Sequence, residues 1–453
     1  MKWLLVIQIL ALFLSITNMM NYNSIFADDM EKLIQEITTN HPEIKALDYA
    51  YISKKADAEH SDAYPDLKIG LAYRNYPYNR QLNRSDNSLR TPAMTGIEYT
   101  VSQEIPFPGK LTLQKKVATL GVVEFSHFKR AEKNKMVQEL LVNLIILKNT
   151  EKRIAQYEEM GKITESLEKI SKSSYSSGSV SLSKVFRNKI NYTQLKDKIL
   201  SIKTERDAIL ASLEYYKVGE IKDTKTLIDS NIDEYIEKLD NKIQSKTIDE
   251  LTIEARQSPD YKLSLSSMEK AKQEEILNKI THLPDTEVFF SYMKRRNQNF
   301  VIDQGPLNYQ IMDTTEFRGD LFSMGLTMRV PSWSLLKHNS LSEKGESNTK
   351  SIQNEESKRK LSIETNIKKL ISNYKNIKDR IELVQTKLIP EINQTISSTN
   401  ATYQSGKIEL SEVLSMKLEL ILAKITELEL FENKQVTIVS LVSMIDWLIA
   451  GEN

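Results

Sequence analysis

Two stretches of the sequence join a strand pattern directly to an exceptionally long helical pattern. In the first, residues 95–103 alternate as in a strand, and a helical pattern opens at Leu111 and continues to about Ser174. The segment between them is Glu104-Ile-Pro-Phe-Pro-Gly-Lys110. A second junction of this kind, at residues 329–333, lies about three-quarters of the way along the chain. Few folds contain a strand that leads directly into a long helix at two places in the chain.

Prolines mark both junctions. Proline lacks an N–H and fixes φ, so a proline-rich segment ends a sheet ladder and redirects the chain. The first junction has Pro106, Pro108 and Gly109, whereas the second has only Pro331. We expect these four residues to mark a barrel-to-tube junction, as argued below, and the two halves to turn differently there.

Composition favours helices and excludes several functions. Only 13 glycines and 11 prolines occur among 453 residues, and 27% of the residues are charged. Basic and acidic residues nearly balance, which gives no argument for nucleic-acid binding. There is no cysteine, which excludes disulfides, cysteine-based zinc sites, thiol catalysis and a lipid on an N-terminal cysteine.

Residues 1–27 read as a secretory signal peptide. Lys2 supplies a positive start, the stretch 4–16 is almost wholly apolar, and Ala27 offers a small residue at a cleavage point. The apolar stretch is shorter than the roughly 20 residues of a spanning helix. An uncleaved anchor is the alternative. The sequence predicts export.

The rest of the first half follows a readable order. Residues 28–61 are helical in pattern, 67–74 alternate as a strand, 75–93 read as a polar loop, and the strand ending at Ile105 completes a hairpin. After the long helix, a turn at 175–179 precedes a returning helix over 182–216. Residues 217–245 are irregular in pattern and are predicted to cross between two halves.

The second half repeats the first. The turn Tyr175–Val185 matches Tyr403–Val413 at six of eleven positions, at a constant offset of 228. Pro65-Asp66 likewise recurs as Pro284-Asp285. The sequence therefore predicts two structural repeats, 28–240 and 241–453.

The returning helix of the second half carries an apolar seam. Steps of four and three residues from Leu410 reach Ile449, and nine of the twelve positions are apolar, which favours coiled-coil packing. A second apolar strip, off the seam, includes Val413 and Leu441. A helix with two such strips contacts more than one neighbour, as in a closed ring of helices.

Each strand has about the 9–11 residues that a membrane-spanning β-strand requires. Four strands cannot close a barrel, and open edges cannot face lipid. If the strands cross a membrane, several copies must pool them, and three copies would supply twelve. The alternative is a soluble four-stranded sheet that caps a coiled coil.

This order of elements, with its Gln103–Lys110 junction and duplicated Tyr-x-x-Gly turn, resembles the TolC-like outer-membrane efflux protein family over nearly the whole mature chain. The form of residues 105–110 most resembles the heavy-metal efflux branch, the CusC/CzcC type. The resemblance implies a mainly α fold with a transmembrane β-barrel part: a homotrimer with a twelve-stranded barrel in the outer membrane and an α-barrel across the periplasm.

The resemblance also implies partners and a function. A periplasmic adaptor (membrane fusion) protein and an inner-membrane pump of the resistance-nodulation-division type would complete a tripartite system. The chain would be its passive conduit for small solutes or metal cations, leading from the periplasm to the exterior. Two other readings remain open, a TolC-like channel for type I protein secretion and a secreted coiled-coil tether.

In such proteins the two turns form tips at the periplasmic entrance. The resemblance places adaptor contacts at eight residues: Tyr175, Gly178, Leu182, Val185, Tyr403, Gly406, Leu410 and Val413. An acidic ring that closes the entrance would fall at Glu412, near Leu414. Lys184 holds the equivalent place in the first turn, so we hypothesise a Lys184–Glu412 pair between neighbouring hairpins. The alternative is that Glu412 is an ordinary solvated charge.

Enzyme functions find little support. The five histidines lack metal-ligand spacing such as H-E-x-x-H, and Gly109-Lys110-Leu111 lacks the remainder of a phosphate loop. We therefore expect no catalytic site, no cofactor and no metal centre. The scattered methionines are read mostly as packing residues, with a copper relay as the alternative.

Overall fold

A computed structural model of the chain describes residues 30–76, 94–219, 221–228, 230–301, 313–330, 332 and 337–449. The predicted signal peptide, most of the predicted polar loop and Pro331 lie outside these residues. The chain forms two compact units. The helical unit comprises Met1–Tyr51, Glu124–Leu265 and Glu355–Asn453, and the strand unit comprises Ile52–Val123 and Ser266–Asn354.

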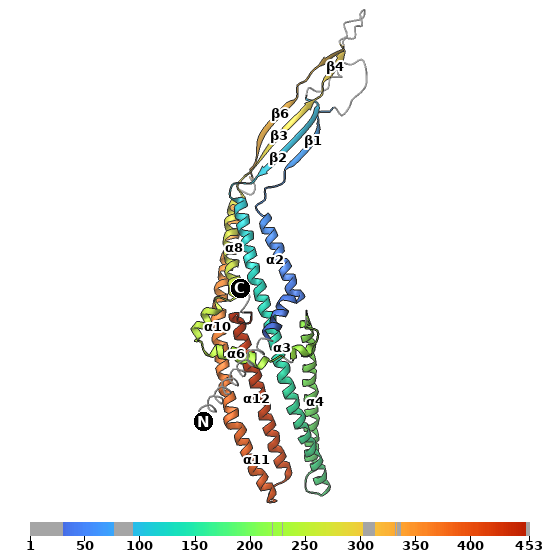
Figure 1. Cartoon of the computed structure of the whole chain (residues 1–453), viewed down its shortest axis with the longest axis vertical. Coiled ribbons are helices and arrows are strands. Elements are labelled where there is room, and N and C mark those ends of the chain that lie inside the picture. Colours follow the sequence, from blue (N-terminus) through green and yellow to red (C-terminus); the bar gives the residue numbers. More distant parts are fainter. Residues whose placement is uncertain are drawn as a thin grey trace, which may run out of the picture. The chain divides into compact units, whose positions relative to one another are not determined.

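The strand unit holds a four-stranded antiparallel sheet in the order β1-β2-β3-β6 (Figure 1). Its strands are β1 (Lys68–Arg74), β2 (Gly96–Ile105), β3 (Asp285–Arg295) and β6 (Leu321–Arg329). Two short strands, β4 (Gln298–Val301) and β5 (Asp313–Glu316), pair separately. The predicted first hairpin is confirmed. Pairing of β2 with β3 joins the two halves of the sequence in one sheet.

The two faces of this sheet differ sharply in polarity. The register places Ile69, Val101, Phe290 and Met324 in one row across all four strands, with Leu71, Tyr99, Tyr292 and Phe322 in the next such row. These side chains are largely exposed, Ile69 at 78% and Met324 at 72%. We call this side the apolar face. Because strand residues alternate, the neighbouring positions form the opposite side, which we call the charged face.

The charged face carries a network of ion pairs. Lys68 Nζ lies 3.5 Å from Glu104 and 3.3 Å from Glu287, and Arg329 lies 3.9 Å from Glu104. At the far end of the strands, Arg74 pairs with Glu98. Met324 and Met328 lie on the apolar face, whereas Met293 lies on the charged face opposite Glu98, and the copper relay stays an untested alternative.

A glycine allows close contact within the sheet. Gly325 is the direct cross-strand partner of Phe289, and a Cβ on Gly325 would lie 2.7 Å from the Phe289 ring. The ring therefore covers the glycine backbone on the charged face, a recognised way of filling the space that a strand glycine leaves.

The predicted long helices are present. The first half contains α2 (Pro42–His60), α3 (Lys110–Ser176), α4 (Leu182–Leu213) and a 3₁₀ turn at Glu214–Tyr216. The second contains α8 (Pro259–Thr281), α10 (His338–Leu383), α11 (Ile389–Gln404) and α12 (Leu410–Ile445). Residues 30–40 are also helical. Of the helices in the described ranges, none combines the length and the apolarity that crossing a membrane requires.

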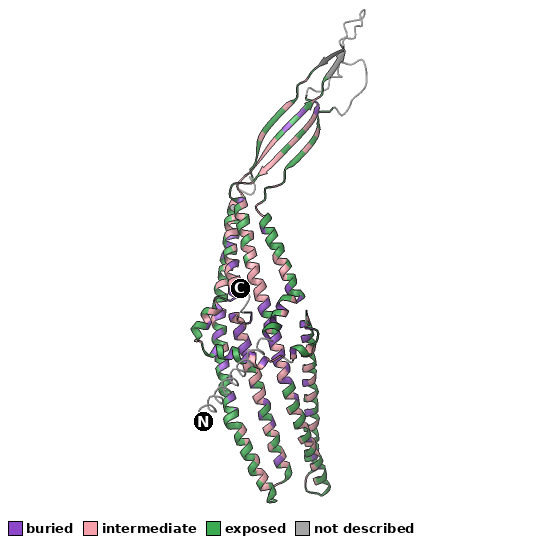
Figure 2. Cartoon of the chain, in the orientation of Figure 1, coloured by how far each residue is buried: buried purple, intermediate pink, exposed green. Residues whose placement is uncertain are grey.

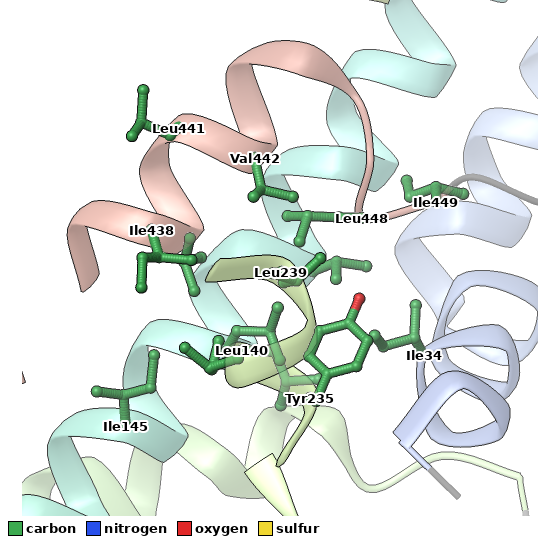
Figure 3. Close-up of a cluster of buried hydrophobic side chains, with 14 of the residues drawn as sticks. Ile34, Leu140, Ile145, Tyr235, Leu239, Ile438, Leu441, Val442, Leu448 and Ile449 are labelled. Carbon is green, nitrogen blue, oxygen red and sulfur yellow. The ribbon is translucent and has the colours of Figure 1, made fainter. Parts of the chain in front are cut away.

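The prediction that residues 217–245 are irregular was wrong. They contain α5 (Thr224–Ile228) and α6 (Ile232–Gln244), followed by α7 (Ile248–Ala255). The buried residues of α6 follow a helical period: Ile232, Tyr235, Ile236, Leu239 and Ile243. They pack on residues 30–40, α3 and α12 in the main core of the helical unit (Figures 2 and 3). Each such side chain contributes roughly 1.5–3 kcal/mol when fully buried.

A polar contact fixes α6 against α10 and α12. Asp240 on α6 accepts hydrogen bonds from Tyr374 Oη at 2.5 Å and from Gln244, and it pairs with Lys434 Nζ at 2.6 Å. Burial raises the pKa of Asp240, but these hydrogen bonds outweigh burial and hold its pKa below the ordinary value. The carboxylate therefore stays charged inside the unit.

One π-helical turn, Val384–Leu388, joins α10 to α11. Ile377 and Ile381, before the turn, and Val384, its first residue, are buried against Leu430 of α12. The Ile389 N–H then bonds to the Val384 carbonyl, five residues back, and Ile389 packs partly against the same cluster. The half-buried positions continue from Ile389 at helical spacing.

The predicted seam of α12 is buried only in part. Ile421, Ile438 and Val442 are buried, whereas Lys417 and Lys424 are exposed. Val413 and Leu441 from the second apolar strip are buried as well. The helix therefore packs on more than one side within its own chain, and a coiled coil stays a prediction.

We predict that Gly325→Ala destabilises the protein by about 1–3 kcal/mol, because the Phe289 ring must move. The double variant Phe289→Ala/Gly325→Ala should recover part of that loss. The measurement is urea unfolding of the detergent-solubilised protein. Gly319→Ala is the matched control, since a Cβ there meets open space. Equal losses for Gly319→Ala and Gly325→Ala would contradict this account.

Candidate functional site

The first strand-to-helix junction is built as a tight turn. Gly109 has φ +93°, a conformation that residues with a Cβ rarely adopt. The Lys110 N–H donates to the Phe107 carbonyl at 3.0 Å, and the Leu113 N–H donates to the Gly109 carbonyl at 3.0 Å, which begins α3. Pro106 and Pro108 flank this turn, and the sheet ladder ends before them at Ile105. The predicted change from strand to helix occurs here within five residues.

A half-buried ion pair ties this junction to the second half. Lys110 Nζ donates to Asp285 Oδ1 at 2.8 Å and to the Leu283 carbonyl at 2.7 Å. The Phe107 N–H donates to the same Asp285 oxygen at 2.8 Å. Lys110 is only 7% exposed. The start of α3 is therefore held to the start of β3.

A cavity of about 510 Å³ lies at this junction, lined by the ends of α2, β2 and α8 and the start of α3. His60, Asp66, Glu104 and Asp285 are among the lining residues. In the described parts of the chain, no three histidine or acidic side chains come together as metal ligands.

The two helical turns share one backbone design. Gly178 and Gly406 have φ of +75° and +73°, and each N–H donates to the carbonyl of the tyrosine three residues earlier at 2.9 Å. A Cβ on either glycine would meet open space, so the left-handed backbone alone calls for glycine.

The predicted tip residues fall into two groups. Tyr175, Leu182, Tyr403 and Leu410 are exposed, as are the two glycines. Val185 and Val413 are buried within the chain. A contact role stays a prediction, now best supported for the six exposed residues.

The structure pairs Lys184 with a residue that sequence reasoning missed. Lys184 Nζ lies 3.3 Å from Glu409 Oε2 within the chain, and the hypothesised Lys184–Glu412 pair between neighbouring hairpins stays a prediction. Ser411 Oγ also donates to Glu409 at 2.9 Å. These bonds, from Ser411 first and Lys184 second, lower the pKa of Glu409.

Glu412 nevertheless lies near this pair. A cavity of about 560 Å³ is lined by residues of both turns, among them Lys184, Glu409, Glu412 and Ser415. Glu412 is exposed and Leu414 is half-buried. The repeat could have signalled Glu409, because it aligns with Ser181, so only the second turn has an acidic residue directly before its helix.

Comparison with solved structures places this arrangement among known proteins. The outer-membrane channel OprN superposes with a TM-score of 0.66 at 9% identity, covering 92% of this chain and 90% of that one. CusC, described for transmembrane channel formation, gives 0.64 at 14% identity, with 92% of each chain covered. The CmeC outer membrane channel of Campylobacter jejuni gives 0.64 at 11% identity, covering 94% and 87%.

The chain has the TolC-like fold. The resemblance seen in the junction and turn motifs is thus confirmed at the level of the fold. No protein-family model matches the chain, and no curated protein does. CusC is one structural neighbour among several channels, so the heavy-metal branch stays a prediction.

We predict that Lys110→Met destabilises the protein by about 2 kcal/mol, because the Asp285 carboxylate loses its cation in a half-buried setting. The matched control is Lys115→Met, which removes an exposed pair with Asp62 and should cost at most about 1 kcal/mol. Urea unfolding compares the two. Similar losses for both variants would show that the Lys110–Asp285 pair has no special role.

Proposed function

We propose that the protein is the outer-membrane channel of a tripartite efflux system, a passive conduit that exports small solutes or metal cations. The observation that carries this proposal is the four-stranded sheet, with its exposed apolar face and its charged opposite face. The TolC-like fold supports it. Localisation in the outer membrane, with a periplasmic helical part, belongs to the same proposal.

The apolar face suits contact with lipid. Its rows through Ile69 and Leu71 are apolar across all four strands, and Ile69, Leu71 and Leu326 are 65–78% exposed in the single chain. An exposed apolar patch of this extent marks a surface that another apolar phase covers. The charged face, with Lys68, Glu104 and Glu287, then lines a water-filled interior.

The edges of the sheet call for further copies of the chain. Within the four-stranded sheet, β1 and β6 each pair on one side only. Lipid offers no hydrogen-bond partners, so β6 of one chain must pair with β1 of another until a barrel closes. Three chains would close it with twelve strands, which is the proposed homotrimer. The same three chains would pool their long helices into an α-barrel.

The two helical turns are the proposed contacts for a periplasmic adaptor, which would link the channel to a resistance-nodulation-division pump. Tyr175, Leu182, Tyr403 and Leu410 offer exposed apolar surface there. The turns at Gly178 and Gly406 have similar φ angles and backbone hydrogen bonds, which supports the proposed duplication of the chain.

The Lys184–Glu409 pair is the proposed latch of the entrance. It connects the first turn to the second beside Glu412. Three Glu412 side chains near a narrow axis would repel one another and attract cations, with Leu414 behind them. Opening would separate the turns and break the latch.

We predict that the purified protein forms trimers and conducts discrete currents in planar lipid bilayers. Met324→Lys should abolish insertion, because a lysine facing lipid costs about 2–4 kcal/mol at the membrane centre. Ser323→Lys, the neighbour on the charged face, should still insert and conduct. If both variants stay soluble and folded without a channel, the tether reading would replace this one.

We predict that Lys184→Glu and Glu412→Lys each raise passive leak, measured as uptake of a bulky dye or antibiotic in cells lacking other such channels. The exchange Lys184→Glu/Glu409→Lys should restore low leak, because it rebuilds the latch with its charges reversed. Lys189→Glu, on the exposed side of α4, is the control. Unchanged leak in both single variants would exclude a gate at this place.

A further inference from the structure

The Lys110–Asp285 pair lies where two neighbouring strands from different halves of the chain meet. Asp285 is the first residue of β3, and β3 pairs antiparallel with β2. The start of β3 therefore lies beside the end of β2, where the first junction begins. Lys110, at the start of the following helix, reaches back to Asp285 with its Nζ 2.8 Å from the carboxylate.

The first half of the chain has an aspartate, Asp66, that corresponds to Asp285 but has no lysine bound to it in the described part of the chain. Pro65-Asp66 stands just before β1 as Pro284-Asp285 stands at the start of β3. Asp66 is exposed, and among the described residues it forms no ion pair. Asp66 lines the cavity at the first junction, and it lies two residues before β1, which is an edge strand because it has only β2 as a neighbour in the four-stranded sheet.

The second junction has a lysine, Lys337, one residue before the position that corresponds to Lys110. Helix α10 begins at His338, as far ahead of Tyr403 as the start of α3 lies ahead of Tyr175. Lys337 directly precedes α10, and its carbonyl accepts from the Ser340 N–H at 3.1 Å. Lys337 is exposed and, within the described ranges, forms no ion pair.

In the proposed barrel, strand direction would bring these two residues to the same end of neighbouring strands. The strands β1, β2, β3 and β6 alternate in direction, so a β1 strand added beyond β6 lies antiparallel to it. The start of that β1 then lies beside the end of β6, just as the start of β3 lies beside the end of β2. Asp66 of the added chain therefore meets the second junction.

We propose that Lys337 of one chain binds Asp66 of the next, and that this ion pair repeats at each seam between chains. The inference rests on the proposed barrel, and it names the contact that sets the register where two chains meet. Arg329 is the other cation nearby, but it already lies 3.9 Å from Glu104 of its own chain. Lys337 thus repeats between chains what Lys110 does within one.

The absence of cysteine allows a direct test. Asp66→Cys and Lys337→Cys are introduced together into the full-length protein, which is purified as the assembled oligomer and treated with a short thiol-to-thiol cross-linker. Dimer and trimer bands are expected on denaturing gels. Each single-cysteine variant should stay monomeric there, and the pair Asp66→Cys/Arg329→Cys should cross-link far less.

Light scattering on the same samples separates the possible failures. A trimer without the Asp66–Lys337 cross-link, or with preferential linkage to position 329, overturns the inference and leaves the proposed channel standing. If the protein is monomeric or dimeric, the proposed barrel is wrong, and the inference that rests on it is wrong as well.

Charge exchange tests the pair without a cross-linker. Asp66→Lys should shorten the lifetime of the trimer in hot detergent about tenfold, as three pairs of ordinary strength are lost. Adding Lys337→Glu should restore the lifetime, whereas adding Arg329→Glu should not. If Arg329→Glu restores the lifetime and Lys337→Glu does not, Arg329 is the partner of Asp66, and the assignment to Lys337 is overturned.

Discussion

Pairing of β2 with β3 is the interaction on which the rest of the structure depends. The two strands are separated by 179 residues that are mostly helical, yet they form the centre of one sheet. Every backbone hydrogen bond between them fixes the first half of the chain against the second. The Lys110–Asp285 pair reinforces the same seam where the strands end. The sheet has two faces of opposite polarity only because this pairing aligns them in register.

Much of the fold is readable from local pattern. The long helix was predicted from Leu111 to about Ser174, and α3 spans Lys110–Ser176. Prolines and a glycine end a strand for stereochemical reasons that neighbours cannot override, so the junction was readable too. The turns at Gly178 and Gly406 were recognisable because two copies of one motif share their glycine. Such features depend on residues close in sequence.

What failed depends on contacts between distant segments. The helix α6 was missed because polar residues surround it in the sequence, although its apolar residues follow a helical period. The Lys184–Glu409 pair was not predicted, because the turn motif shows which residues correspond and not which side chains meet. Asp240 drew no attention, since nothing local indicates that Tyr374 and Lys434 approach it. Tertiary packing decides these cases.

The π-helical turn before α11 has a consequence for how one helical run meets its neighbour. An extra residue in a single turn rotates all that follows by roughly 100° about the helix axis. Continued at α-helical spacing, the buried series ending at Val384 would next present Leu388 and then Glu391. The wider turn instead presents Ile389, Ile392 and Ile396, all half-buried. The extra residue thus keeps Glu391 out of the buried face of the helix. The helix changes which residues face its neighbour without being interrupted.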